Sequence, residues 1–136
     1  MSRFLTLAAC QTGPVQRSAS RRETVGRLVH LLERAAAAGA ELAVFPEMAL
    51  TTFFPRWQLD GPREIDAFYE TEIPGPLTQP LFDAARRLGI GFALGFAELA
   101  QDQGRKRRFN SMCLAGADGV KERGPAPLHI LRFPGA

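Results

Sequence analysis

Long apolar runs, cysteine and histidine are scarce in this sequence of 136 residues, and these shortages exclude several classes of protein. No apolar run approaches the ~20 residues that a membrane-spanning helix needs. The two cysteines, Cys10 and Cys113, lie far apart and show neither metal-ligand spacing nor a disulfide framework. Free cysteines favour a reducing compartment. We therefore expect a cytoplasmic protein that has no metal site and does not bind a membrane.

The composition is that of one ordinary globular domain, with 46% hydrophobic and 23% charged residues. The length allows a single sizeable core. The net charge is +3, and much of the excess lies in the basic run 105–108. No aromatic residues that could stack on bases accompany this run. We interpret it as a solvated turn and expect no nucleic-acid partner.

The first third of the chain predicts a strand, a helix and a second strand. Residues 4–10 form a short apolar run, which indicates a buried strand. Ser20-Arg21-Arg22-Glu23 has the form of a capping box, and Gly39 stands where a left-handed C-cap belongs. We expect a helix over 20–38 and a strand over 41–45. The short connections make this a βαβ unit with a parallel pair of strands.

Glycine and proline then divide the chain into further segments. In order, the sequence predicts an aromatic-rich loop over 46–61, an amphipathic piece over 62–69, a helix over 77–88 ended by Gly89, a strand over 90–99, a polar turn over 101–108, a strand over 109–115 and a fifth strand beginning over 120–123.

These segments predict an α/β fold: a mixed sheet with helices on one face. The turns between the last three strands are too short for crossover helices, so those pairs should be antiparallel. Nothing after Arg123 indicates another core helix, because residues 124–127 contain two prolines and 128–133 is short. A sheet covered on one face only would expose a large apolar surface.

Glu47 is the candidate chemical residue. It lies two residues past the predicted second strand, and ligands of open α/β sheets bind outside the carboxyl ends of strands. Phe53, Phe54 and Trp57 follow closely, and either wall a pocket or pack beneath the loop. Aromatic neighbours would partly desolvate the carboxylate and favour a general-base role. The alternative is a glutamate that only caps or pairs at the end of a strand.

Two long segments carry a family resemblance. Phe45-Pro46-Glu47, with the loop behind it, and Phe109-Asn110-Ser111 before the Asp118-Gly119 turn resemble the nitrilase (carbon–nitrogen hydrolase) superfamily. Within it, residues 49–57 and 68–76 are similar to the N-carbamoyl-D-amino acid amidohydrolases. The resemblance covers roughly residues 4–123.

This resemblance implies a Glu-Lys-Cys triad on an αββα sandwich, of which this chain would form the N-terminal half. Glu47 would be the general base that takes the thiol proton and later activates a water. The thiolate would attack the carbamoyl carbon, and the lysine would stabilise the oxyanion. The products would be a D-amino acid, CO2 and ammonia, without cofactor or metal. Phe54, Trp57 and Asn110 are the candidate substrate-binding residues, and family members are usually homo-oligomers.

The lysine and the cysteine of the triad have no counterpart in this sequence. Aligned on His129, the lysine position holds Pro127; aligned on Pro134-Gly135, it holds Ile130. Lys121 comes too early, inside the predicted fifth strand. The cysteine motif of the family lies well beyond residue 136, and we interpret Cys10 and Cys113 as core residues. We therefore expect the 136-residue chain to have no hydrolase activity.

We accordingly divide the chain into a partial carbon–nitrogen hydrolase domain over 1–123 and a divergent tail over 124–136. The abrupt change after Arg123 suggests a frameshift or a premature stop, which the other reading frames of the coding DNA would test. The alternative is a non-catalytic α/β binding or interaction domain that associates through the half-sandwich surface.

Overall fold

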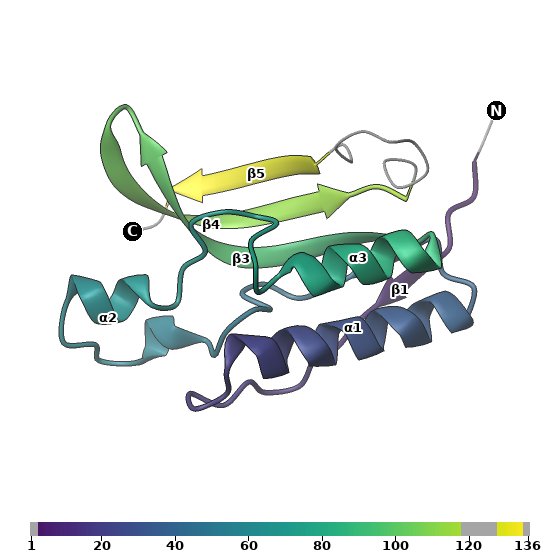
Figure 1. The fold of residues 1–136 in the computed structure, drawn as a ribbon, viewed down its shortest axis with the longest axis horizontal. Coiled ribbons are helices and arrows are strands. Elements are labelled where there is room, and N and C mark those ends of the chain that lie inside the picture. The colour runs from purple at the N-terminus through teal and green to yellow at the C-terminus, as the bar shows by residue number, and fades with distance from the viewer. Residues whose placement is uncertain (1–2, 118–127, 135–136) are drawn as a thin grey trace.

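A computed structural model describes residues 3–117 and 128–134 (Figure 1). Helices α1 and α3 lie side by side and cover one face of a single sheet. The elements are, in chain order, β1 (Leu7–Ala9), α1 (Arg21–Ala37), β2 (Leu42–Val44), the 3-10 turn η1 (Phe54–Arg56), α2 (Pro62–Asp66), α3 (Gln79–Leu88), β3 (Gly91–Asp102), β4 (Arg105–Ala115) and β5 (Leu128–Pro134).

The sheet has the strand order β1-β2-β3-β4-β5. The pairs β1–β2 and β2–β3 are parallel, whereas β3–β4 and β4–β5 are antiparallel. The predicted α/β class, with a mixed sheet and helices on one face, is therefore confirmed.

The local signals at the helix ends are also confirmed. The Glu23 backbone N–H donates to Ser20 Oγ at 3.2 Å, and the Glu23 carboxylate accepts the Ser20 backbone N–H at 2.7 Å, so the capping box closes in both directions. Gly39 after α1 and Gly89 after α3 have φ values of +83° and +65°. A side chain would be strained there, which explains why both helices end at glycine.

Alternation along the strands separates a core face from an open face. The core face packs against α1 and α3, and its fully buried side chains include Phe92, Leu94 and Cys113. The large apolar side chains exposed on the opposite face are Leu7, Val44, Met112, Leu114, Leu131 and Phe133. The expected apolar surface is thus present.

Two strand predictions need correction. The segment 4–10 is not a buried strand: β1 is short, lies at the edge of the sheet, and its Leu7 is 57% exposed. The polar turn predicted over 101–108 shrinks to Gln103 and Gly104, whose φ values are +50° and +75°. A two-residue turn with positive φ matches the twist of the strands, so β3 and β4 extend through the charged residues into a long hairpin (Figure 1).

The tail after Arg123 contains a strand that the sequence did not predict. β5 pairs with β4 through seven residues, including Ile130 opposite Cys113. The predicted fifth strand over 120–123 lies outside the described residues. Within them, no helix is long and apolar enough to cross a membrane.

The buried carboxylate of Glu98 links β3 to β5 through side-chain contacts. Glu98, on β3, is 7% exposed and accepts a hydrogen bond from Ser111 Oγ at 2.7 Å. Arg132, on β5, donates to both carboxylate oxygens of Glu98, each at 2.7 Å. This two-pronged contact is the strong form of arginine–carboxylate pairing. β5 is therefore held by side-chain charge as well as by the strand ladder.

Candidate functional site

Glu47 lies on a loop that is pressed onto the open face of β3. The Phe45 N–H donates to Ala93 O and the Ala49 N–H donates to Gly95 O, both at 2.9 Å. A Cβ at Gly95 would lie 2.8 Å from Glu47 Cα, so only glycine permits this close approach. Met48, the next residue, has a φ of +51°, which is strained for a methionine. Glu47 is therefore placed by the backbone of the loop and by the missing side chain of Gly95.

The carboxylate of Glu47 has a partner from a distant part of the chain. Asn110 Nδ2 donates to Glu47 Oε1 at 2.5 Å. Asn110 lies on β4 opposite Ala97, on the open face of the sheet. The structure thus brings two of the residues chosen from the sequence into direct contact. Glu47 itself is exposed, so the expected desolvation by its aromatic neighbours is not present.

The aromatic candidates line a cavity of about 530 Å³ beside Glu47 and Asn110. Phe54 is 4% exposed, stacks on Phe68 with ring centroids 4.8 Å apart, and contacts Tyr69 at 5.4 Å. Trp57 is 37% exposed. The two alternatives weighed for these aromatics therefore both hold for Phe54, which packs beneath the loop and also lines the cavity.

Two guanidinium groups lie over the Trp57 ring. Arg17 lies 5.4 Å and Arg56 5.0 Å from the centre of its ring. Arg17 also pairs with Glu64 on α2 at 2.5 Å. Such contacts orient the ring at low cost because a guanidinium stacks on an aromatic face. Arg56 itself is exposed and contacts this ring.

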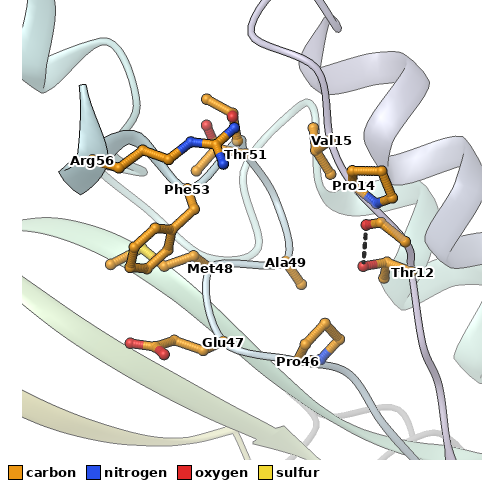
Figure 2. A pocket seen from close by; sticks show the side chains of 12 residues that line it. Thr12, Pro14, Val15, Pro46, Glu47, Met48, Ala49, Thr51, Phe53 and Arg56 are labelled. Atoms are coloured by element: carbon orange, nitrogen blue, oxygen red, sulfur yellow. Dashed lines mark hydrogen bonds between the residues drawn. The ribbon is translucent and has the colours of Figure 1, made fainter.

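A smaller cavity of about 260 Å³ lies on the other side of the Glu47 loop (Figure 2). The segment containing Thr12 and Pro14 forms one wall, and the loop from Pro46 to Phe53 forms the other. Figure 2 shows the Glu47 side chain directed away from Pro14. The carboxylate instead contacts Asn110, which lines the larger cavity.

Sequence reasoning missed Arg108 as a wall of the larger cavity. Arg108 was interpreted as part of a solvated turn, yet it is only half-exposed and its Nε and Nη2 donate to Asp66 Oδ1 at 2.9 and 2.6 Å. Burial raises the pKa of the neighbouring Tyr69; the Arg108 charge opposes this and the Asp66 charge adds to it. The available signal was spacing: Arg108 is two residues before Asn110, so both side chains share one face of the strand.

Neither cysteine is placed to serve as the nucleophile. Cys113 is fully buried on the helix-covered face of β4, opposite to the face that holds Glu47, and burial raises its pKa to about 12. Cys10 is 8% exposed, and burial raises its pKa as well. A thiol without thiolate character is a poor nucleophile.

This burial predicts slow chemistry at both cysteines. We expect 5,5′-dithiobis(2-nitrobenzoate) at pH 8 to label neither thiol rapidly in the native chain, because the reagent needs an exposed thiolate. In guanidinium chloride both thiols should react at the rate of a free cysteine. Rapid native labelling, traced to Cys113 by peptide mapping, would show that the core opens at β4.

Within residues 3–117 and 128–134, no group of three or more histidine, cysteine, aspartate or glutamate side chains could hold a metal ion. The chemistry visible at this site is that of one hydrogen-bonded carboxylate beside an aromatic cavity.

Comparison with known proteins gives the same fold. The structure resembles an N-terminal amidase, with a TM-score of 0.61 at 18% identity over 94% of this chain. It also resembles an amidase from Nesterenkonia sp., with a TM-score of 0.58 at 19% identity over 83% of this chain. The chain spans only 27% and 38% of these two proteins.

The sequence itself matches a known family over nearly its whole length. Residues 6–124 match the family described as carbon-nitrogen hydrolase, a stretch that contains Glu47 and Asn110. This match covers most of the chain, and the two amidases share its fold. The chain therefore belongs to the carbon-nitrogen hydrolase (nitrilase) superfamily.

Proposed function

We propose that the cavity beside Glu47 takes an N-carbamoyl-D-amino acid and that Glu47 is the general base of carbamoyl C–N hydrolysis. The observation that carries this proposal is the 2.5 Å hydrogen bond from Asn110 to Glu47 at the edge of the aromatic cavity. That bond occupies Oε1, and among the described residues no hydrogen bond reaches Oε2. A carboxylate with one oxygen anchored and the other free can accept a proton in a defined direction.

The residues around the carboxylate suit an aromatic N-carbamoyl amino acid. Trp57 and Phe54 offer ring surface for an apolar side chain, while Asn110 stands beside Glu47 where a urea-like group would lie. In the proposed reaction a thiolate attacks the carbamoyl carbon, ammonia leaves, and Glu47 activates the water that releases CO2 and the amino acid. This chain supplies the base and the wall of that site, and neither Cys10 nor Cys113 supplies the thiolate.

Binding tests the site. We expect N-carbamoyl-D-phenylglycine to shift the nuclear magnetic resonances of the Trp57 indole and the Asn110 side-chain amide. Trp57→Ala should raise the dissociation constant about tenfold, because an aromatic anchor that the ligand covers often carries this share of binding. Leu77→Ala is the matched control, since Leu77 is 48% exposed and lies outside this cavity. Equal weakening by both variants, or no shift at all, would argue against the assigned cavity.

A turnover assay tests the expectation that this chain, without the lysine and cysteine of the triad, is inactive. We expect the purified 136-residue chain to release no ammonia from N-carbamoyl-D-phenylglycine, because the lysine and cysteine positions are not matched in this sequence. Ammonia release that disappears in Glu47→Ala would overturn this expectation while supporting Glu47 as the base.

The second candidate function is that of a non-catalytic interaction domain. The exposed apolar side chains on the open face of the sheet favour it, with Leu131 and Phe133 exposed by 55% and 60%. Such a surface on a soluble domain marks an interaction site or an aggregation hazard. A monodisperse chain with a cooperative melt would favour the interaction domain, and an aggregating chain would favour a partial enzyme.

A further inference from the structure

Arg21 stands at a position where a positive charge is unfavourable. It is the first residue of α1, directly after the N-cap Ser20. The amino end of a helix carries a partial positive charge, so basic residues are disfavoured there. An exposed arginine at this position could swing into solvent, yet the Arg21 side chain is only 15% exposed. Its contacts must therefore offset both the helix dipole and the loss of hydration.

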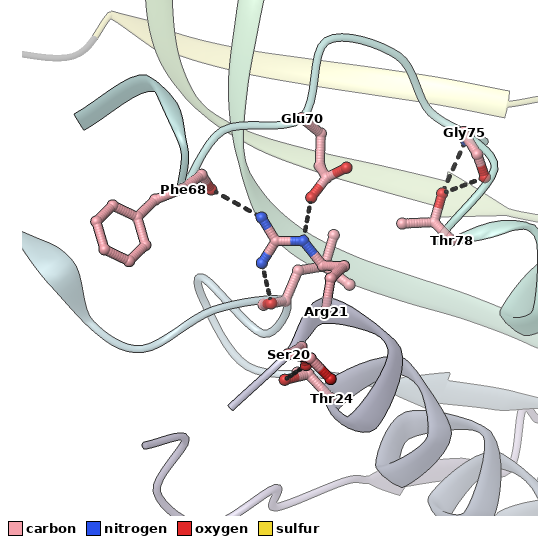
Figure 3. A network of polar contacts seen from close by, with 8 residues as sticks. Ser20, Arg21, Thr24, Phe68, Glu70, Gly75 and Thr78 are labelled. Carbon is pink, nitrogen blue, oxygen red and sulfur yellow. Dashed lines mark hydrogen bonds and ion pairs between the residues drawn. The ribbon is translucent and has the colours of Figure 1, made fainter. Parts of the chain in front are cut away.

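Those contacts join three segments of the chain, namely α1, the Glu47 loop and residues 68–70 (Figure 3). Arg21 Nη1 donates to Leu50 O, on the loop that begins with Glu47. Nη2 donates to Phe68 O at 3.3 Å, and Nε lies 2.5 Å from Glu70 Oε1. One guanidinium thus holds the Glu47 loop against the segment 68–70.

The segment 68–70 is in turn attached to the strand that faces Asn110. The Glu70 N–H donates to Ala97 O, and the Leu99 N–H donates to Glu70 O, both at 2.8 Å. Ala97 pairs with Asn110 across the hairpin. Phe68 stacks on Phe54, which lines the cavity. Arg21 therefore links the loop that carries Glu47 to the segment that carries part of the aromatic wall and pairs with the strand opposite Asn110.

We infer that Arg21 is a positioning residue for the Glu47 site: it sets the spacing between the Glu47 loop and the aromatic wall without touching the cavity. This inference rests on the proposed function, because that function makes the Glu47 site matter, but the Asn110 resonances can test it without a substrate. Glu70 is its counter-charge, a carboxylate that is 14% exposed. Burial raises the pKa of Glu70 more than the adjacent Arg21 charge and contact lower it. The pair is thus sheltered from water, where a fixed geometry is worth most.

Arg21→Lys tests the inference because lysine keeps the positive charge but lacks the several directed N–H donors of the guanidinium. A single ammonium can face Glu70 but cannot also span the carbonyls of Leu50 and Phe68. We expect the Asn110 side-chain amide resonances to move upfield as the hydrogen bond to Glu47 loosens. The dissociation constant of N-carbamoyl-D-phenylglycine should rise about tenfold, because the displaced Glu47 loop and aromatic wall fit the ligand less well.

Leu28→Ala is the control for mere destabilisation. Leu28 lies two turns further along α1, is fully buried, and contributes to the core between the helices and the sheet. Its truncation should lower the melting temperature at least as much as Arg21→Lys does, while the Asn110 resonances stay in place. If both variants lose similar stability but only Arg21→Lys moves the Asn110 resonances, Arg21 has a positioning role and not merely a structural one.

The outcomes are distinct. Unchanged Asn110 resonances in Arg21→Lys, or an equal displacement in Leu28→Ala, would overturn the inference. A wild-type chain that binds no N-carbamoyl-D-phenylglycine would instead count against the proposed function, while the Asn110 resonances would still report on Arg21.

Discussion

Gly95→Ala should displace the Glu47 loop and destabilise the chain by about 1–3 kcal/mol, the range for overpacking a close contact. The new Cβ would lie 2.8 Å from Glu47 Cα and 2.9 Å from Pro46 O. Both are backbone atoms, so no side-chain rotation can relieve the clash. The loop must lift from β3, which would break the hydrogen bond from Ala49 to Gly95 and separate Glu47 from Asn110.

Urea unfolding measures the stability, and the Asn110 side-chain amide resonances measure the displacement. Gly26→Ala is the matched control, because Gly26 lies within α1 and no atom lies within 4 Å of its added Cβ. That substitution should stabilise the chain by about 0.5–1 kcal/mol, the helix preference of alanine over glycine. If Gly95→Ala kept full stability and unshifted Asn110 resonances, the close approach of the loop to β3 would be wrong.

Arg132→Met should release β5 and lower the free energy of unfolding by about 1–3 kcal/mol, the cost of leaving a buried polar group unpaired. Glu98 would lose both contacts from Arg132 and keep, among the described residues, only the hydrogen bond from Ser111. The estimate stays below that of a fully buried ion pair because the Arg132 side chain is 49% exposed and water screens it. Methionine keeps the length of the apolar stem.

The stability lost in Arg132→Met should depend on pH in a defined direction. Burial acts to raise the pKa of Glu98, but the hydrogen bonds from Arg132 and Ser111, with the Arg132 charge, lower it below its ordinary value of 4.5. A carboxyl whose pKa is lower in the folded state stabilises the fold above its unfolded pKa. The difference between wild type and Arg132→Met should thus be full at pH 7 and fade as the pH falls through 4.5 towards the lowered pKa.

The control for this series is Arg87→Met. Arg87 pairs with Glu33 at 2.8 Å, but their side chains are 59% and 42% exposed. Exposed pairs contribute about 0–1 kcal/mol, so this variant should be nearly neutral at every pH. Hydrogen exchange at the β4 amides that face β5 should accelerate in Arg132→Met alone. Equal behaviour of the two variants would show that β5 is held by its backbone ladder only.

Local signals predicted what local interactions control. The capping box at Ser20 and the glycines after both helices set the helix boundaries to within two residues, because each acts over one helical turn. Strand ends were less accurate, because pairing across the sheet extends a strand wherever a tight turn permits it. Gln103 and Gly104 supplied such a turn, and β3 and β4 lengthened accordingly.

The divergent tail shows the same limit more strongly. The two prolines of 124–127 would interrupt a strand, and the short apolar run over 128–133 gave no sign of a core helix, so the sequence predicted no further element there. The edge of β4 and the buried Glu98 carboxylate lie far away in the sequence, so no local pattern could reveal that 128–134 had partners for its backbone and for Arg132. Tertiary contacts outweighed local propensity there.

The sequence by itself determined the α/β class, the helix ends and the family, because each rests on local patterns along the chain, and it singled out Glu47 as the candidate base. Only the tertiary structure decided that Asn110, 63 residues away, is the partner of Glu47, and that Arg21 turns inward instead of into solvent. It also decided that the Glu47 carboxylate is exposed, although aromatic residues surround it in the sequence. The reason is physical: strand register and the packing of loops onto the sheet join residues that no sequence period relates.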